Sequence, residues 1–219
     1  MKKLIVFDWD GTLSDSETRI VENMIVASDS LNLPSPSREL IADTIGMKII
    51  DAISVLYPEI NKKGALELKN KFREISDSQE NHEPPLFSKV LETLKVLSKY
   101  YQLAIATNKS INGIEKSLSA HSNLTKYLTC YFGTGPIQPK PSQEMMQIIL
   151  QIAGAKNLDT IMIGDTEIDF HFSQRSGVDF IGLARNETKM KKLINCGVKL
   201  IISDISELPR LLKHYEQSR

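Results

Sequence analysis

The stretch Leu4-Ile5-Val6-Phe7-Asp8-Trp9-Asp10-Gly11-Thr12-Leu13 decides the expected fold, because a short apolar run ends there in two acids. A second apolar run, Thr160–Ile163, is followed in the same way by Asp165 and Asp169. Both runs are too short and too apolar for surface helices, which predicts buried strands. Ligands of open α/β sheets bind beyond the carboxyl ends of parallel strands. The two acidic segments are therefore expected to form a single site.

Acidic side chains brought together at two strand ends repel one another unless a cation neutralises them. The set expected here consists of Asp8, Asp10, Asp165 and Asp169. Ligation by oxygen alone suits a hard cation, and Mg²⁺ is the natural choice. Asp169 follows Asp165 by about one helical turn, so it could reach the metal from a helix start or simply stabilise that helix terminus. The pattern predicts a metal-dependent enzyme.

The composition excludes several other functions. Lys+Arg 27 balances Asp+Glu 27, so no global field attracts nucleic acid or an anionic membrane. No stretch approaches the roughly 18 apolar residues of a membrane span. Cys130 and Cys196 lie far apart, and the four histidines are scattered, which argues against a zinc site. Reduced thiols in a cytoplasmic protein are the expected state.

Strands and helices are expected to alternate along most of the chain. Helix-period stretches such as Ser142–Ala153, and a last helix opened by Ser206 with Pro209 in its first turn, separate the apolar runs. This alternation is typical of an α/β protein, with a Rossmann-like parallel sheet core flanked by helices. The expected strands are the runs ending at Phe7, Ala106, Ile163 and Leu183, together with Leu200–Ile202 and the weaker Tyr131-Phe132.

One segment interrupts the alternation with helices alone. Ser14-Asp15-Ser16-Glu17 carries a capping-box pattern, and apolar residues then recur at helical spacing. Two further helices are expected over Ile49–Tyr57 and Lys62–Ser78. The prediction is an all-helical cap over residues 15–83, inserted into an α/β catalytic core made of residues 1–14 and 84–219. Its hinges are expected near Ser14–Glu17 and His82–Leu86.

The first acidic segment suits phosphoryl transfer. A carboxylate at the position of Asp8 can attack phosphorus and form an aspartyl-phosphate. Asp10 has the same side-chain parity and could protonate the leaving oxygen and later activate water. Gly11 lets the backbone turn close to a phosphate, and Thr12 adds a hydroxyl or an amide donor. The competing interpretation is an ordinary Asx-type turn after a strand.

Two other segments offer groups to the same chemistry. Thr107-Asn108 ends the second strand and could bind phosphate oxygens, although both residue types are also ordinary helix N-caps. Lys140 stands between Pro139 and Pro141, where its ammonium could hold Asp8 ionised and neutralise phosphoryl charge. It could equally be a solvated lysine in a rigid loop.

These segments, in this order, resemble the four motifs of the haloacid dehalogenase-like superfamily, and the run Asp8–Ser16 resembles its phosphatase branch. The resemblance implies Asp8 as nucleophile and Asp10 as acid and base. It implies Mg²⁺ on the carboxylates of Asp8 and Asp165 and on the main-chain carbonyl of Asp10. It further assigns phosphate binding to Thr107, charge stabilisation to Lys140 and a supporting place near the metal to Asp169.

Within that superfamily the chain looks most like phosphoglycolate-phosphatase-type enzymes with a helical cap. Gly46-Met47-Lys48, in the expected cap, resembles the family's substrate-specificity loop, which makes Gly46 and Lys48 candidate substrate contacts. The other interpretation of Gly46 is a glycine that ends the preceding helix. Related sequences tend to carry alanines where this chain has Ser173 and Ser176, a difference attributed to packing.

The expected function is Mg²⁺-dependent hydrolysis of a small phosphorylated metabolite through an aspartyl-phosphate. Asp10 argues against the dehalogenase branch, whose chemistry does not need it. A sugar-phosphate phosphomutase shares every catalytic residue and stays open as an alternative. A phospho-receiver or a binding module without activity is the alternative outside enzymes, and steady turnover would separate it from a phosphatase. Neither the substrate nor the oligomeric state is fixed by any pattern in the sequence.

Overall fold

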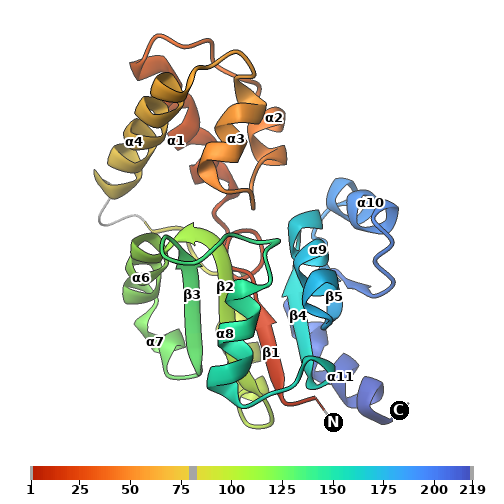
Figure 1. Cartoon of the computed structure of the whole chain (residues 1–219). Helices are drawn as coiled ribbons and strands as arrows, with labels where there is room; N and C mark the ends of the chain where they lie inside the picture. The colour runs from red at the N-terminus through yellow and green to blue at the C-terminus, as the bar shows by residue number, and fades with distance from the viewer. Residues whose placement is uncertain (1, 79–82, 218–219) are drawn as a thin grey trace.

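A six-stranded parallel sheet forms the centre of the computed structural model, which describes residues 2–78 and 83–217 (Figure 1). The strands lie in the order β3-β2-β1-β4-β5-β6, the doubly wound arrangement of a Rossmann-like fold. The predicted α/β fold is therefore confirmed, including the strand expected from Tyr131-Phe132. The strands are β1 (Leu4–Phe7), β2 (Gln102–Ser110), β3 (Cys130–Thr134), β4 (Thr160–Gly164), β5 (Asp179–Leu183) and β6 (Ile201–Ile202).

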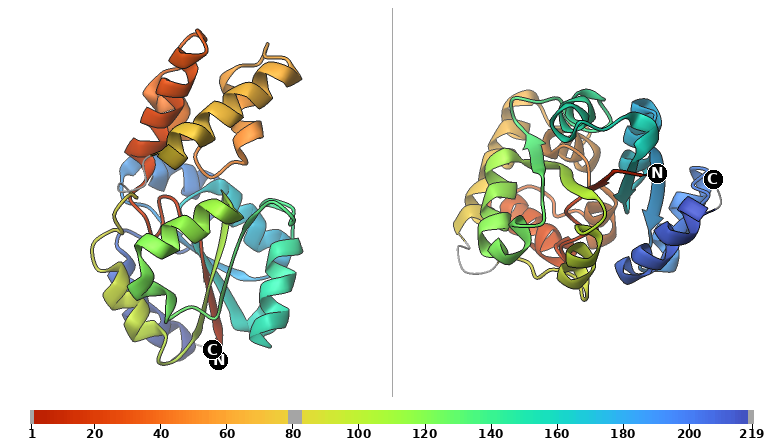
Figure 2. Two further views of the ribbon diagram at one scale, coloured as in Figure 1. Left: turned by 90° about the vertical axis from the view of Figure 1, so that its left-hand side faces the viewer. Right: turned by 90° about the horizontal axis from the view of Figure 1, so that it is seen from below.

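Helices cover both faces of the sheet, which is why β1 is apolar at every position (Figure 2). Ile5 and Phe7 pack against one layer, and Leu4 and Val6 pack against the opposite one. The first layer contains α5 (Val90–Leu97), α6 (Ile111–Ala120), α7 (Ser122–Thr125) and α11 (Leu208–Gln217). The second contains α8 (Glu144–Ala153) and α9 (Glu167–Ser176), while α10 (Glu187–Asn195) packs beyond β5.

The strand register brings the motif residues to one edge of the sheet. Phe7 is level with Ile105 of β2 and Ile163 of β4. The Asp8 amide continues the ladder by donating to the Ile163 carbonyl at 2.9 Å. Side chains alternate along a strand, so Asp8 shares the parity of Leu4 and Val6 and faces the layer of α8 and α9.

Four helices between β1 and α5 stand above the carboxyl ends of the strands (Figure 1). Their own apolar core includes the buried residues Met24, Ile41, Ile53 and Leu68. We call this group of helices the cap, and its division from the core at residues 15–83 stays a prediction. The helices are α1 (Glu17–Ser30), α2 (Arg38–Asp43), α3 (Ile49–Leu56) and α4 (Lys62–Ser78).

The two chain segments that lead into and out of the cap lie side by side. Ser14 forms an antiparallel bridge with Leu86. The Asp15 amide donates to the Pro85 carbonyl at 2.8 Å, and the Phe87 amide donates to the Leu13 carbonyl at 3.0 Å. These bonds fix both connections at the edge of the core. His82, at the start of the second predicted hinge, lies outside the described residues.

Three local predictions about helix starts are wrong. Ser14–Glu17 forms no capping box, because Ser14 is held in the bridge to Leu86 and Ser16 makes no side-chain cap. Helix α8 begins at Glu144, two residues later than expected. The last helix begins at Leu208, after a 3-10 turn over Ile205–Glu207 that Asp204 caps in place of the predicted Ser206.

The described helices give no indication of a membrane span. None of those within residues 2–78 and 83–217 is both long and apolar enough to span a bilayer. Helix α4, with 17 residues, carries charged side chains along its whole length.

Candidate active site

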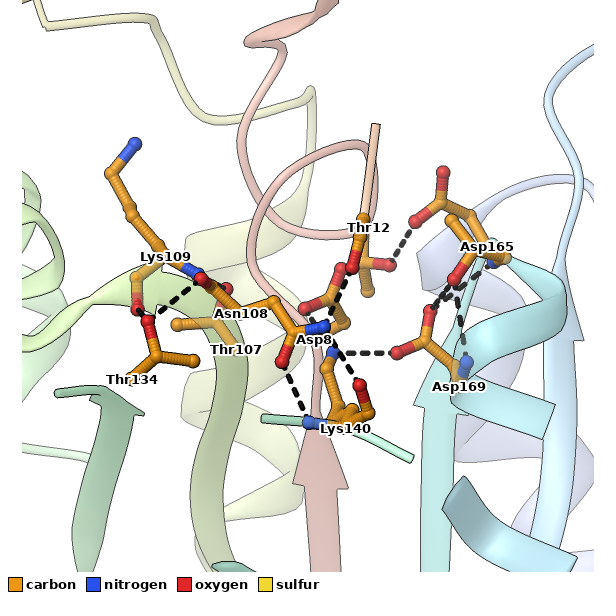
Figure 3. Close-up of polar contacts among 11 residues, drawn as sticks. Asp8, Thr12, Thr107, Asn108, Lys109, Thr134, Lys140, Asp165 and Asp169 are labelled. Carbon is orange, nitrogen blue, oxygen red and sulfur yellow. Dashed lines mark hydrogen bonds and ion pairs between the residues drawn. The ribbon is translucent and has the colours of Figure 1, made fainter. Parts of the chain in front are cut away.

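Three aspartates from separate elements meet at the carboxyl end of the sheet (Figure 3). Asp8 follows β1, Asp165 follows β4 and Asp169 lies in the first turn of α9. All three are buried, and one carboxylate oxygen from each lies within 4.8 Å of the others. We call these three residues the aspartate cluster. The sequence placed them at one site, and the structure brings them together.

Lys140 joins two members of the aspartate cluster. Its Nζ lies 2.6 Å from Asp8 Oδ1 and 2.6 Å from Asp169 Oδ1, and the side chain is almost completely buried. Burial alone would lower the pKa of Lys140, but attraction to Asp169 and Asp8 outweighs it and raises that pKa above its ordinary value. Lys140 is therefore a fixed ammonium, and the interpretation as a solvated loop lysine is wrong.

Asp165 has both carboxylate oxygens occupied by donors from the protein. Thr12 Oγ1 donates to Asp165 Oδ1 at 2.7 Å, and Lys189 Nζ donates to Oδ2 at 2.6 Å. Gly11 approaches so closely that an added Cβ would lie 2.3 Å from Asp165 Oδ2, and its φ of +83° also favours glycine. Burial raises the pKa of Asp165, while Lys189 and Thr12 act to lower it.

Asp169 also serves the helix that carries it. Its Oδ2 accepts hydrogen bonds from Thr166 Oγ1 at 2.7 Å and from the Thr166 amide at 3.2 Å. Together with the bond from the Asp169 amide to Thr166 Oγ1, these contacts form a capping box at the start of α9. The helix-terminus interpretation of Asp169 therefore holds together with its place in the aspartate cluster.

The charge balance and the donor atoms of the site both suit a divalent cation. The three carboxylates of the aspartate cluster and the two ammonium groups that contact them, Lys140 and Lys189, carry one excess negative charge as a set, and Lys189 also contacts Glu17 at 3.4 Å. Burial, with the nearby Asp169 and Asp165, raises the pKa of Asp8 well above its ordinary value despite the attraction of Lys140. The donors are all carboxylate oxygens, the ligands that Mg²⁺ prefers.

Asn108 connects the core to the cap. Its Oδ1 accepts from the Lys140 amide at 2.7 Å, and its Nδ2 donates to the Lys140 carbonyl at 3.1 Å. The same Nδ2 donates to the Gly46 carbonyl at 2.8 Å. The N-cap interpretation of Thr107-Asn108 is wrong, because β2 continues to Ser110 and Ser110 caps α6. Thr107 is buried next to Asn108 and accepts from the Lys109 amide at 3.2 Å.

The two cap residues chosen from the sequence take different positions. Gly46 lies against the core, with a φ of +94° and space for a Cβ only 3.0 Å from Thr166 Cγ2. It does not end a helix, since α2 stops at Asp43 with Thr44 as its C-cap. Lys48 is exposed at the start of α3 and lines a groove outside the aspartate cluster.

Three basic residues near the site were missed by sequence reasoning. Lys109 Nζ lies 3.4 Å from Asp10 Oδ1, and its position directly after Thr107-Asn108 was a usable signal. Lys189 contacts Asp165 from α10, and no spacing in the sequence predicts that contact. Arg185 Nη2 donates to the Thr12 carbonyl at 3.1 Å, and its guanidinium lies 3.7 Å from the ring centroid of Phe87.

Fold and site together define an α/β protein with a buried acidic centre at the switch point of a doubly wound sheet. The family model for haloacid dehalogenase-like hydrolases matches residues 5–183. The chain belongs to this family. The matched range runs from Ile5 in β1 to the end of β5 and includes the whole cap and every site residue predicted from the sequence, whereas Arg185 and Lys189 lie beyond it.

Individual relatives support the same assignment. The chain is 29% identical to the probable phosphatase IndB of Dickeya dadantii, over 95% of this chain and 92% of that protein. It is 26% identical to a phosphoglycolate phosphatase of Vibrio parahaemolyticus, over 94% of each chain. A haloacid dehalogenase-like hydrolase from Streptococcus pneumoniae has the same fold, with a TM-score of 0.86 at 22% identity over 96% of this chain and 98% of that one. This protein is a phosphatase of the haloacid dehalogenase-like family, acting on phosphorylated substrates.

Proposed function

We propose that this phosphatase hydrolyses a small phosphomonoester with an anionic leaving group, similar to phosphoglycolate, and that it uses Mg²⁺. The aspartate cluster with its buried Lys140 is the observation that supports this most. A nucleophile, a fixed ammonium and further carboxylates at one strand edge are the parts that phosphoryl transfer requires. The similarity to a phosphoglycolate phosphatase supports the choice of substrate class.

The proposed reaction has two steps. In the first, a carboxylate oxygen of Asp8 attacks phosphorus, the bond to the ester oxygen breaks, and Asp10 gives that oxygen a proton. In the second, a water oxygen attacks the phosphorus of the aspartyl-phosphate, Asp10 accepts the proton of that water, the bond from phosphorus to the Asp8 oxygen breaks, and inorganic phosphate leaves with the Asp8 carboxylate restored. The side chain of Asp10 is only partly buried beside Lys109, so it can exchange protons with bulk water between turnovers.

Other residues of the site position the phosphoryl group. Lys140 contacts Asp8 Oδ1 directly, so its charge lies where negative charge accumulates during transfer. We assign the Thr107 hydroxyl and the main-chain amide of Asn108 to the phosphate oxygens, together with the backbone at Gly11 and Thr12, because the side-chain amide of Asn108 is already bonded to Lys140 and Gly46. The close approach of Gly11 to Asp165 shows why a side chain there would crowd the site.

The magnesium ligands proposed here are the carboxylates of Asp8 and Asp165 and the main-chain carbonyl of Asp10, with Asp169 in support. When bound, Mg²⁺ supplies charge that neutralises the transferring phosphoryl oxygens. The one unbalanced negative charge of the described site is consistent with such an ion.

The cap, with limits proposed at residues 15–83, acts as a lid that excludes water and bulky leaving groups. Gly46 lies where the cap meets the core, through its hydrogen bond to Asn108. Lys48 follows two residues later and offers its charge to an anionic leaving group. A protein or nucleic-acid substrate does not fit beneath such a lid.

The test is a phosphate-release screen with Mg²⁺ over phosphoglycolate, sugar phosphates, nucleoside monophosphates and pyrophosphate. Asp8→Asn keeps the side-chain shape and removes the nucleophile, so turnover should fall on the order of 10⁴-fold or more. Omitting Mg²⁺ and adding EDTA should abolish release. Near-normal turnover by Asp8→Asn would refute the nucleophile, and conversion of sugar phosphates into isomers without phosphate release would favour a phosphomutase.

A further inference from the structure

A groove of about 720 Å³ lies between the cap and the core, separate from the aspartate cluster. Its walls are formed by α3, α4 and the segment 134–139 that follows β3. In Figure 1 this segment runs across the top of the core beneath the two helices. The groove is therefore bounded by both parts of the molecule.

Basic side chains dominate the polar lining of this groove. Lys48 comes from the start of α3, and Lys62, Lys69 and Arg73 come from α4. No acidic residue lines the groove, and none of the four forms an ion pair within residues 2–78 and 83–217. Since the chain as a whole has a net charge of +0, this is a local excess. Like charges gathered without partners favour an anionic ligand.

The basic residues of α4 share one face with apolar residues. Lys62, Leu66, Lys69 and Arg73 are spaced by three or four positions, which places them along a single stripe of the helix. Leu66 is 50% exposed there. Ile50 of α3 lines the same groove. The groove thus combines an apolar surface with positive charge at several points.

The groove adjoins the phosphate site. Its lining residue Thr134 donates from Oγ1 to the Asn108 carbonyl at 3.1 Å, and the two lie together in Figure 3. Its lining residue Pro139 precedes Lys140, whose Nζ contacts Asp8. Lys48 follows Gly46, which accepts the hydrogen bond from Asn108. A molecule bound with its phosphate at Asp8 can therefore extend toward the groove.

We infer that this groove binds the leaving group of the substrate, and that this group has an apolar segment and a second, distal anionic group. Lys69 and Arg73 are the specificity-determining residues for that anion. The inference rests on the proposed phosphomonoester hydrolysis and goes beyond it, since the single methylene of phosphoglycolate offers little apolar surface to Ile50 and Leu66. The distal anion is a phosphate or a carboxylate, which share the charge that the groove selects.

The test compares esters that differ only in the distal group. Butyl and hexyl phosphate are matched with the bisphosphates of butanediol and hexanediol, and with carboxyalkyl phosphates of the same lengths. The wild type should favour at least one dianionic series by about tenfold in kcat/KM. The double substitution Lys69→Gln with Arg73→Gln should remove that preference and leave the plain alkyl phosphates unchanged. Lys71→Gln, on α4 but paired with Glu74, is the matched control and should keep it.

Each outcome decides between the two proposals. A wild type without preference, or equal losses on charged and plain esters in the double variant, would overturn the groove assignment and leave the phosphatase mechanism intact. Absence of phosphate release from every ester would refute the proposed function. The groove is then judged by calorimetric titration with hexane bisphosphonate: weaker binding by the double variant than by Lys71→Gln supports it, and equal binding refutes it.

Discussion

The catalytic edge of the core and the underside of the cap are held in opposite ways. In the core, Lys140 and the aspartate cluster are almost completely buried, and each ion pair is 2.6 Å long. The cap meets the core through scattered polar contacts, such as Asn108 with Gly46 and the exposed pair of Lys192 with Asp43. Its apolar residues pack mainly among themselves. The core therefore fixes the reacting groups, while the contacts between cap and core contribute little free energy and break easily.

This difference suits a lid over a rigid site. Buried charges hold their geometry, because separating them would leave an uncompensated charge out of water. Exposed ion pairs contribute little, so they permit movement. As the proposed lid, the cap would pivot at the edge of the core where Ser14 bridges Leu86.

After the loss of the nucleophile Asp8, the largest effect is expected from Asp10, the reactive side chain that is least buried. Asp10→Asn should lower kcat by about 10²–10⁴-fold, the usual contribution of acid–base catalysis. The Mg²⁺ concentration for half-maximal activity should stay unchanged, because the proposed metal contact is the main-chain carbonyl. Steady-state kinetics at several Mg²⁺ concentrations measure both. A loss that saturating Mg²⁺ restores would assign Asp10 to the metal instead.

The second prediction ranks the two aspartates that follow β4. Asp165→Ala should weaken Mg²⁺ binding more than Asp169→Ala, for which about a 10- to 100-fold loss is expected of a supporting residue. Both carboxylates are hydrogen-bonded in the structure, but Asp169 accepts three bonds, from Lys140 and from Thr166, and Asp165 accepts two, so the oxygens of Asp169 are less free to coordinate. Fluorescence of Trp9, the single tryptophan and the neighbour of Asp8, offers a readout independent of activity. The reverse order would show that the two roles are exchanged.

More of the core site than of the cap could be predicted from the sequence. Asp8 directly follows a strand, so parity fixes the side to which its carboxylate points, and parallel register brings Asp165 beside it. These are short-range rules with few alternatives. The contact of Lys189 with Asp165 depends instead on how α10 folds back, which no local pattern encodes. The failed capping box at Ser14 has the same origin, since a tertiary bridge to Leu86 overrode a local preference.

The third prediction concerns the energetic cost of the crowded core site. In EDTA at neutral pH, Asp8→Asn should raise the free energy of unfolding by about 1 kcal/mol, since functional sites often trade stability for reactivity. The variant removes the one unbalanced charge and leaves Lys140 paired with Asp169. Urea denaturation measures the change. A destabilised variant would show that Asp8 contributes more to the ion network than its burial costs.

The pH dependence of this effect follows from the raised pKa of Asp8, whose first cause is burial. A carboxyl group with a higher pKa in the folded state binds protons more tightly there than in the unfolded state. Its destabilising effect is fully present above the folded pKa and is relieved as pH falls through it. The advantage of Asp8→Asn should therefore shrink on acidification, and an advantage that grows would contradict the raised pKa.

The smallest effect is expected at the exposed pair of Lys192 with Asp43, which joins α10 to the cap. Lys192→Ala should change the free energy of unfolding by less than about 0.5 kcal/mol, because solvent screens the pair. Lys191→Ala is the matched control, since Lys191 pairs with Glu187 within α10 and does not reach the cap. Urea denaturation of both variants isolates the contribution of the contact between cap and core. If Lys192→Ala cost about 2 kcal/mol more than Lys191→Ala, the cap would be anchored and its role as a mobile lid would fail. Equal, small changes would leave Asn108 and the Ser14–Leu86 bridge as the contacts that guide closure.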